Sequence, residues 1–145
     1  MVWALVAGVL GGCSTHSVGR APTTDDYERK ARTTAEVALS AVETVRLVAD
    51  TASAGDAFAS YTNVSLSEQE DSLGAAQGDF ESIQPPHASL DDLREQLIAI
   101  LDNATAHVAD VRIAARRGQL AGLDEVAAPL AADAEALRAF EDELS

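Results

Sequence analysis

Apolar residues between positions 90 and 115 recur at alternating intervals of three and four positions without a break. Because an α-helix completes a turn about every 3.6 residues, this spacing places them along one side of a single long helix. Asp91 and Asp92 fall in its first turn, Ser89 can cap it, and Gly118 follows its last turn. The predicted inward residues are Leu90, Leu93, Leu97, Ile100, Leu101, Ala104, His107, Val108, Val111, Ala114 and Ala115.

The same spacing predicts an earlier helix that begins at Thr23 or Thr24 and ends near Gly55. Acidic residues four positions before basic ones predict ion pairs on its outer face, and these pairs explain the basic residues there better than a lipid-headgroup patch does. The expected pairs are Asp25–Arg29, Asp26–Lys30 and Glu28–Arg32. The predicted inward residues are Ala31, Ala35, Ala38, Leu39, Val42, Val45, Val48, Ala49 and Ala52.

A further helix is expected to open at Ser65 or Ser67, each of which has a glutamate three positions later, as in a capping box. Pro85-Pro86 ends it, because proline lacks the backbone N–H that a helix requires. Its predicted inward residues are Leu66, Leu73, Ala76, Phe80 and Ile83.

Two features of this region leave alternatives open. Phe58, Tyr61 and Val64 recur at three-residue spacing, which fits either a helical turn or a packed loop. Gly74 and Gly78 should each cost about 1 kcal/mol relative to alanine inside a helix. We expect them to allow close approach of a neighbouring helix, and a ligand groove is the alternative.

The last helix begins between Leu120 and Asp124 and runs to the end of the chain, with Pro129 expected to kink it or to move its start to about Ala128. Its predicted inward residues are Leu123, Ala127, Leu130, Ala134, Leu137, Phe140 and Leu144. Four amphipathic segments with short connections predict an all-α fold, an antiparallel up-down-up-down four-helix bundle over residues 23–145. Alanine supplies 29 of the 145 residues, so we expect a thin core.

The formal net charge of −14 falls entirely after position 13. Such a charge disfavours nucleic acid and broad adhesion to anionic lipid, because both attract basic proteins. No Lys or Arg occurs between Arg46 and Arg94, whereas nine Asp or Glu residues do. This acidic stretch is interpreted as a solubilising face, and the alternatives are a docking surface for a basic partner or a weak divalent-cation surface.

Candidates for chemistry are few. His107 alone among the three histidines lies on an apolar face, and Asp110, one turn away, is its expected partner. Together they provide at most two ligands, whereas zinc sites use three or four. The sequence also lacks the His-Glu-x-x-His, Gly-x-Ser-x-Gly and phosphate-loop motifs. We therefore expect a structural His107, no enzyme, and no catalytic, cofactor-binding or metal-ligating residue.

The apolar run of residues 1–12 ends at the only cysteine, in the sequence Leu10-Gly11-Gly12-Cys13-Ser14. This sequence resembles the bacterial lipobox, in which the cysteine is lipidated and becomes the mature N-terminus. Residues 1–12 are then a signal peptide, since they are too short to span a bilayer. The run lacks a preceding Lys or Arg, so either the signal is atypical or Met1 is not the true start. The alternative is a buried or frayed N-terminal segment with an ordinary cysteine.

Residues 13–22 are small and polar and predict a flexible tether between the lipid and the bundle. Two further strings, Ser82-Ile83-Gln84-Pro85-Pro86 and the segment from Arg112 to Gly118, resemble small secreted actinobacterial lipoproteins that have no assigned activity. The resemblance implies a palmitate-bearing lipoprotein on the outer face of the cytoplasmic membrane and carries no catalytic residues.

These observations predict a non-catalytic lipid-anchored module that contacts the membrane through Cys13 and acts on an unknown envelope protein. Neither nucleic acid nor a small-molecule substrate is expected. The alternative function is a small-molecule or metal-binding helical bundle that uses His107 and nearby carboxylates.

Overall fold

A computed structural model describes Ala21 and residues 23–145. The predicted signal peptide 1–12, Cys13 and most of the tether 13–22 lie outside the described residues. Within the described part the protein is all-α, as predicted, with four helical limbs and no β-strand. In chain order these are α1 (Thr24–Ser53), α2 (Ala59–Glu81), the short 3-10 helix η1 (Ala88–Leu90) leading into α3 (Asp91–Arg116), and a last limb made of α4 (Leu123–Ala127) and α5 (Leu130–Glu143).

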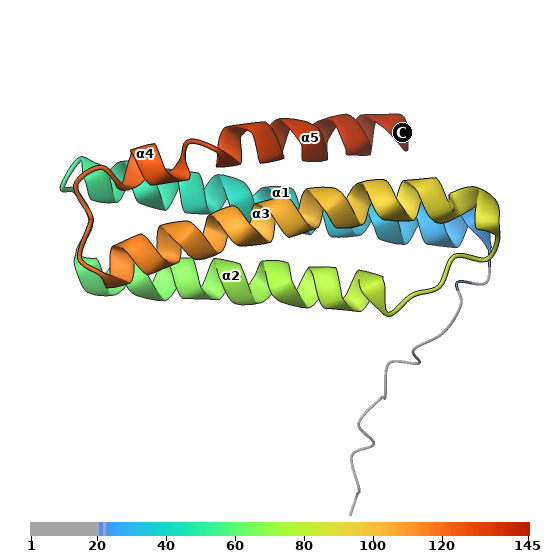
Figure 1. Ribbon diagram of the computed structural model, residues 1–145, viewed down its shortest axis with the longest axis horizontal. Helices are drawn as coiled ribbons and strands as arrows, with labels where there is room; N and C mark the ends of the chain where they lie inside the picture. The colour runs from blue at the N-terminus through green and yellow to red at the C-terminus, as the bar shows by residue number, and fades with distance from the viewer. Residues whose placement is uncertain (1–20, 22) are drawn as a thin grey trace, which may run out of the picture.

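The helices lie lengthwise beside one another (Figure 1). The α1–α2 and α3–α4 connections lie at one end of the molecule, which we call the distal end. The α2–α3 connection lies at the opposite end, which we call the entry end, because the described chain enters α1 there. Ala21 is buried at the entry end, and its backbone N–H donates to the Gln84 carbonyl at 3.0 Å.

The helices α1 and α3 form the centre of the molecule, since each contacts all the other α-helices; α1 shows how the core is built. Thr23 caps α1 by accepting a hydrogen bond from the Asp26 N–H, and Gly55 follows its end with a φ of +80°. Six of its ten buried residues are alanines, and such small side chains permit a close approach of the neighbouring helices. Its buried residues are Tyr27, Ala31, Ala35, Ala38, Ala41, Val42, Val45, Val48, Ala49 and Ala52, which include nearly all of those predicted.

Larger side chains from the other limbs fill the core around the alanines of α1. Tyr27 packs on Phe80 of α2 with ring centroids 5.5 Å apart. The predicted inward face of α3 is confirmed over most of its length, and Gly118 follows its end with a φ of +77°. The expected Ser89 cap is wrong, because Ser89 lies inside η1 and Leu90 precedes α3 without a side-chain cap. The fully buried large side chains beyond α1 are Leu66, Leu73, Phe80, Leu97, Leu101, Leu123, Leu130, Leu137 and Phe140.

The predicted N-cap of α2, Ser65 or Ser67, is wrong by seven or nine residues. The helix begins at Ala59, and Phe58 occupies the N-cap position without a side-chain hydrogen bond. Residues 59–65 therefore form its first turns, in which Thr62 is buried and donates its hydroxyl to the Phe58 carbonyl at 3.1 Å. A capping box could not reveal this start, since no capping side chain marks it.

The two glycines of α2 do not allow a close helix approach, contrary to the expectation. Both are exposed, and a Cβ added at Gly74 or Gly78 would meet no atom within 4 Å. They lie on the outer face of a helix that buries only Thr62, Ser65, Leu66, Leu73 and Phe80. α2 is therefore the least deeply buried of the three long helices, and its glycines weaken it further.

Pro129 divides the last limb into two helices, which agrees with the predicted kink at this residue. α4 ends at Ala127, and Pro129, with a φ of −58°, precedes the first residue of α5. Because proline cannot donate a helical hydrogen bond, the chain makes a tight turn there, closed by Ala131 N–H donating to the Ala128 carbonyl. Both pieces still face the core, through Leu123 and Ala127 of α4 and Leu130, Ala134, Leu137 and Phe140 of α5.

Hydrogen bonds join the distal end of α1 to the start of α4. The Ser53 hydroxyl lies 2.6 Å from a carboxylate oxygen of Asp124 and also accepts from the Asp124 N–H at 3.0 Å. The hydrogen bond from Ser53 holds the pKa of Asp124 below its ordinary value. Among the helices of the described residues, none is long and apolar enough to cross a membrane.

Candidate functional site

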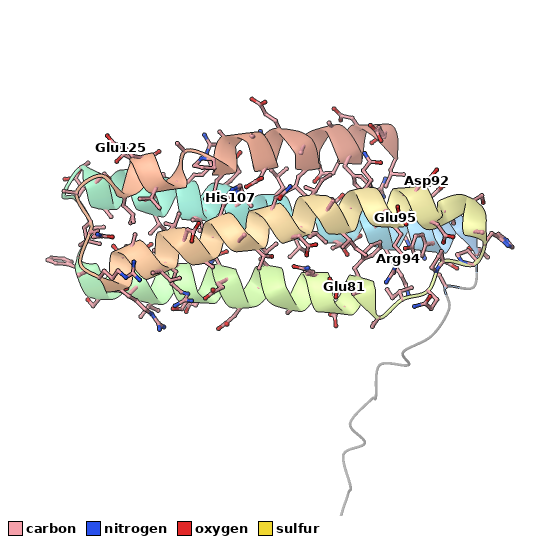
Figure 2. The ribbon with its side chains drawn as sticks, in the orientation of Figure 1. Glu81, Asp92, Arg94, Glu95, His107 and Glu125 are labelled. Atoms are coloured by element: carbon pink, nitrogen blue, oxygen red, sulfur yellow. The ribbon has the colours of Figure 1, made fainter. Side chains whose placement is uncertain are left out.

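The most distinctive polar contact joins α3 to α5. His107 Nδ1 lies 2.6 Å from Asp133 Oδ2, and the two side chains are 35% and 9% exposed. A carboxylate oxygen only accepts, so we assign the Nδ1–H tautomer, in which this N–H donates a hydrogen bond to Asp133. His107 projects from the middle of α3 on the side that faces the last limb (Figure 2).

The prediction that Asp110 pairs with His107 is wrong. Asp110 is exposed, whereas Asp133 reaches the imidazole from another helix. A signal for this contact was present in the sequence, because Asp133 lies three residues after Leu130 and four before Leu137, both inward-facing. Asp133 therefore occupies the same stripe of α5 as the core leucines and is carried into the interior with them.

The His107–Asp133 pair by itself offers little chemistry. Within residues 23–145 the imidazole makes one side-chain hydrogen bond, the one to Asp133. The described residues contain no group of three or more His, Cys, Asp or Glu side chains that could hold a metal ion. The arrangement fits a structural contact between α3 and α5, in which each side chain satisfies a polar atom of the other.

The α2–α3 interface is held by polar contacts as well as by its leucines. Gln77 Nε2 donates to Asp102 at 2.7 Å, and its amide oxygen accepts from the Thr105 hydroxyl at 2.9 Å. Nearer the distal end, Glu70 and Arg112 form an ion pair between the two helices. Polar contacts at several points along the two helices thus add to the apolar packing of this interface.

Arg94 of α3 secures the entry end of α2. Its guanidinium donates to the Ile83 carbonyl at 2.6 Å and to the Glu81 carbonyl at 2.8 Å, and it lies over the Phe80 ring. Helix C-termini leave carbonyls without partners, and Arg94 supplies a donor for two carbonyls at this terminus. Arg94 and Glu81 lie together at this end of α2 (Figure 2).

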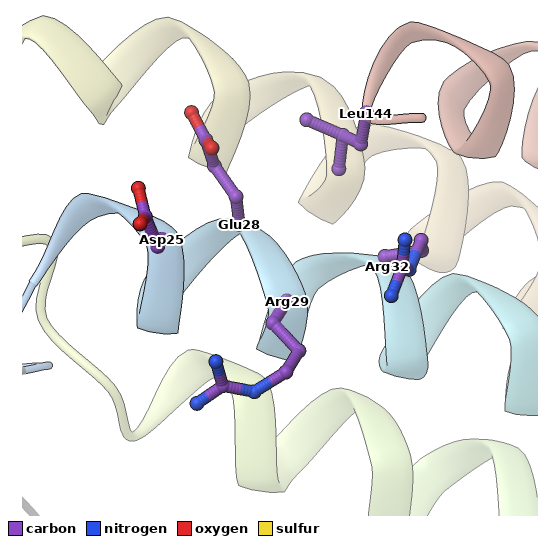
Figure 3. A pocket seen from close by; sticks show the side chains of 5 residues that line it. All are labelled: Asp25, Glu28, Arg29, Arg32 and Leu144. Carbon is purple, nitrogen blue, oxygen red and sulfur yellow. The ribbon is translucent and has the colours of Figure 1, made fainter.

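A hollow of about 200 Å³ lies at the start of α1, lined by Asp25, Glu28, Arg29, Arg32 and Leu144. Its four charged side chains carry both signs and spread along α1 without converging on one point (Figure 3). The predicted ion pairs are wrong in register, because Arg29 pairs with Asp26 and Arg32 with Glu36. The hydrogen bond from Arg29 lowers the pKa of Asp26. The two arginines of the hollow are thus paired with carboxylates outside its lining, and its charged groups form no ligand-selective arrangement.

A second hollow of about 320 Å³ runs between α1 and α2, and neither Gly74 nor Gly78 is among its lining residues. It is open and has a largely apolar lining without a charged pair, so it offers no convergent polar groups to orient a ligand. Its lining residues are Thr33, Thr34, Val37, Ser72, Ala75, Ala76 and Asp79.

The largest exposed apolar side chains lie at the distal end. Phe58, Tyr61 and Val64 are 84%, 60% and 57% exposed, and we call these three residues the distal apolar row. The prediction of a helical turn is confirmed for Tyr61 and Val64, which lie in α2. The alternative prediction, a packed loop, is wrong, because these side chains are helical and exposed. Their three-residue spacing was a signal for one helix face, but it did not distinguish a core face from an exposed one.

The chain matches no protein-family model, no curated protein and no solved structure. The candidate sites are therefore defined by the geometry alone, and they are the His107–Asp133 pair, the two hollows and the distal apolar row.

Proposed function

We propose that the protein is a non-catalytic helical module, held by lipid on Cys13 at the outer face of the cytoplasmic membrane, that acts through contacts with other proteins. The sequence from Leu10 to Ser14 supports the anchor through its resemblance to a lipobox. A diacylglycerol supplies two acyl chains, and at about 0.8 kcal/mol per buried methylene two chains hold a protein stably where one does not.

We also propose an antiparallel up-down-up-down topology. Its support is that successive limbs are joined at alternate ends of the molecule (Figure 1). In this topology the entry end faces the tether, and the 30 residues of α1 span about 45 Å to the distal end. The distal end is then the part of the domain held furthest from the lipid.

The observation that carries the proposed contact function is the exposure of the distal apolar row. Single exposed apolar residues are common on protein surfaces. Here an aromatic residue at the N-cap position of α2 is followed at three-residue spacing by an aromatic residue and a valine inside the helix, and each of the three is more than half exposed. Aromatic side chains are enriched in protein interfaces, where they supply much of the binding energy.

The anchor is tested by Cys13→Ser, with Ser14→Ala as the matched control, in bacterial cells that process lipoproteins. We expect Cys13→Ser to release the protein from the membrane fraction and Ser14→Ala to leave it there. Membrane retention of Cys13→Ser at the level of the natural sequence would remove the lipoprotein proposal.

The contact function is tested with a photoreactive amino acid at position 61, and at position 126 as a control. Val126 is also an exposed apolar residue but lies on α4. In intact cells we expect discrete crosslinked species from position 61 and none of the same size from position 126. The same species from both positions would contradict a role for the distal apolar row.

The alternative function, binding of a metal ion or a small molecule through His107 and nearby carboxylates, would need ligands beyond the His107–Asp133 pair. Titration of the metal-free protein with zinc tests it, with His107→Gln as the control. Under the leading proposal we expect no stoichiometric binding, and His107→Gln should change the free energy of unfolding by less than about 1.5 kcal/mol. Tight zinc binding that His107→Gln abolishes would promote the second candidate.

A further inference from the structure

The distal apolar row lies in strongly acidic surroundings. Asp56 precedes it in the α1–α2 connection, and Glu68 and Asp71 continue its face of α2, four and seven residues after Val64. All three carboxylates are exposed. The row thus forms the apolar start of a face whose continuation is anionic.

The nearest basic side chains offset the charge of this face only in part. The sequence has no Lys or Arg between Arg46 and Arg94. Arg112 of α3 is already paired with Glu70, and the Arg116 guanidinium lies 3.5 Å from the Ser67 hydroxyl. Glu68 and Asp71 have no ion pair among the described residues. With three exposed carboxylates and the single guanidinium of Arg116 beside them, the face keeps a net negative charge next to exposed aromatic rings.

We propose that this face docks a basic amphipathic helix of a partner protein, with the partner's apolar residues on Phe58, Tyr61 and Val64 and its Lys or Arg side chains near Glu68 and Asp71. This inference rests on the proposed contact function and names the chemistry of the partner. A second copy of the chain is disfavoured, because it would bring two chains of net charge −14 together. Anionic lipid is repelled by the same charge.

Charge complementarity and apolar contact have separable effects. Opposite charges steer the encounter and select the partner, whereas burial of aromatic side chains supplies most of the affinity. A basic peptide whose apolar residues are not on one face should be attracted by charge but should gain little affinity from burial of the aromatic side chains. The proposal therefore requires both the amphipathic pattern of the peptide and the distal apolar row of the protein.

The test is a fluorescence-anisotropy titration of the full chain carrying Cys13→Ser, so that lipid plays no part. The probe is a labelled synthetic Leu/Lys peptide of about 18 residues, five helical turns, with its leucines on one face. A scrambled peptide of identical composition and a Leu/Glu peptide of identical pattern are the controls. At physiological ionic strength we expect binding of the patterned Leu/Lys peptide, binding at least about tenfold weaker for the scrambled peptide, and none for the Leu/Glu peptide.

Two pairs of protein variants locate the site. Tyr61→Ser/Val64→Ser removes apolar contact at the row, and Val37→Ser/Val126→Ser removes exposed apolar residues elsewhere. Glu68→Lys and Glu135→Lys change the net charge equally, but Glu135 lies on α5. We expect the first member of each pair to weaken binding by about tenfold and the second by no more than about twofold. Circular dichroism checks that all four variants keep their helices.

Equal losses within either pair, or equal binding of the scrambled peptide, would overturn the proposal. A dimer that Tyr61→Ser/Val64→Ser dissociates, or vesicle binding that the same variant abolishes, would assign the row to a second copy or to lipid instead. The peptide titration uses protein without lipid, so its result does not depend on whether Cys13 is lipidated. The docking proposal and the lipid-anchor proposal can therefore be refuted independently.

Discussion

The His107 imidazole on α3 and the Asp133 carboxylate on α5 meet at 2.6 Å, and the carboxylate is the more deeply buried of the two groups. Asp133 has no other side-chain hydrogen bond among the described residues. Asp133 therefore depends on this hydrogen bond more than His107 does, because its side chain is 9% exposed and that of His107 is 35% exposed. Their contact is a direct polar link between these two limbs of the core.

Removing the histidine alone should be more damaging than removing both partners. His107→Leu leaves the Asp133 carboxylate buried without its donor, which should lower the free energy of unfolding by about 1–3 kcal/mol. His107→Leu/Asp133→Leu replaces both polar groups with apolar ones and should recover most of that loss. Urea unfolding of the two single variants and the double variant measures the coupling.

Asp110→Leu is the control for this cycle, because Asp110 lies one turn from His107 and is exposed. It should change the free energy of unfolding by no more than about 0.5 kcal/mol. If the effects of His107→Leu and Asp133→Leu simply add in the double variant, the two side chains contribute no coupling energy.

A core leucine gives the second prediction. Leu97 is completely buried on α3, so Leu97→Ala should cost about 2–5 kcal/mol through lost apolar burial and the cavity left behind. Leu47→Ala is the matched control, since Leu47 is 66% exposed on α1, and it should stay within about 0.5 kcal/mol of the natural protein. Equal shifts of the two variants in urea unfolding would mean that this face of α3 is not the core.

The α1 and α3 helices could be predicted from the sequence because each has a long unbroken apolar period and a glycine after its end. Those glycines, Gly55 and Gly118, adopt the positive φ that such positions require. α2 offered neither signal clearly: its fully buried large side chains, Leu66, Leu73 and Phe80, are seven residues apart, and no side chain caps its start. Periodicity therefore found the helix, and the capping-box motif misplaced its start.

The polar contacts were harder to predict, for a physical reason. The sequence places Asp133 on the inward stripe of α5, but only the packing of α5 against α3 decides that it faces His107. Likewise, three-residue spacing places Tyr61 and Val64 on one face of α2, while their exposure depends on where α1 and α3 lie. Contacts between helices far apart in the chain are set by the tertiary arrangement, which a local pattern does not contain.

The exposed glycines of α2 give the third prediction. A Cβ at Gly74 or Gly78 would have open space around it to 4 Å, and neither residue has a positive φ. Gly74→Ala and Gly78→Ala should therefore each raise the free energy of unfolding, by up to about 1 kcal/mol, because alanine is the better helix former. Thermal unfolding of the single and double variants measures the gain.

Gly55→Ala is the informative control for the glycine series. It also meets no neighbour within 4 Å, but its φ is +80°, a conformation that strains an L-residue. It should therefore lower the melting temperature where the α2 substitutions raise it. A loss of stability at Gly74 or Gly78 as well would contradict the open space around these two positions.

Glu141, near the C-terminal end of α5, gives the last prediction, which concerns pH. Burial raises the pKa of its carboxyl, and the nearby charges of Glu36 and Asp142 raise it further. The folded protein thus holds this proton more tightly than the unfolded chain does, and the free energy of unfolding falls as the pH rises from the ordinary value of 4.5 through the raised pKa. Above that window the ionised carboxylate remains a constant penalty.

Glu141→Gln removes this penalty, because the amide is neutral at every pH in the window. The variant should melt at a higher temperature than the natural protein at neutral pH, and the difference should shrink below pH 4.5, where the natural side chain is protonated in both states. Glu135→Gln changes the net charge by the same amount on the exposed side of the same helix, so it separates the local effect from relief of the overall negative charge. Because the general effect would act on both variants alike, equal gains at neutral pH would assign the stabilisation to net charge, and a larger gain for Glu141→Gln that disappears in acid would assign it to the partly buried carboxylate of Glu141.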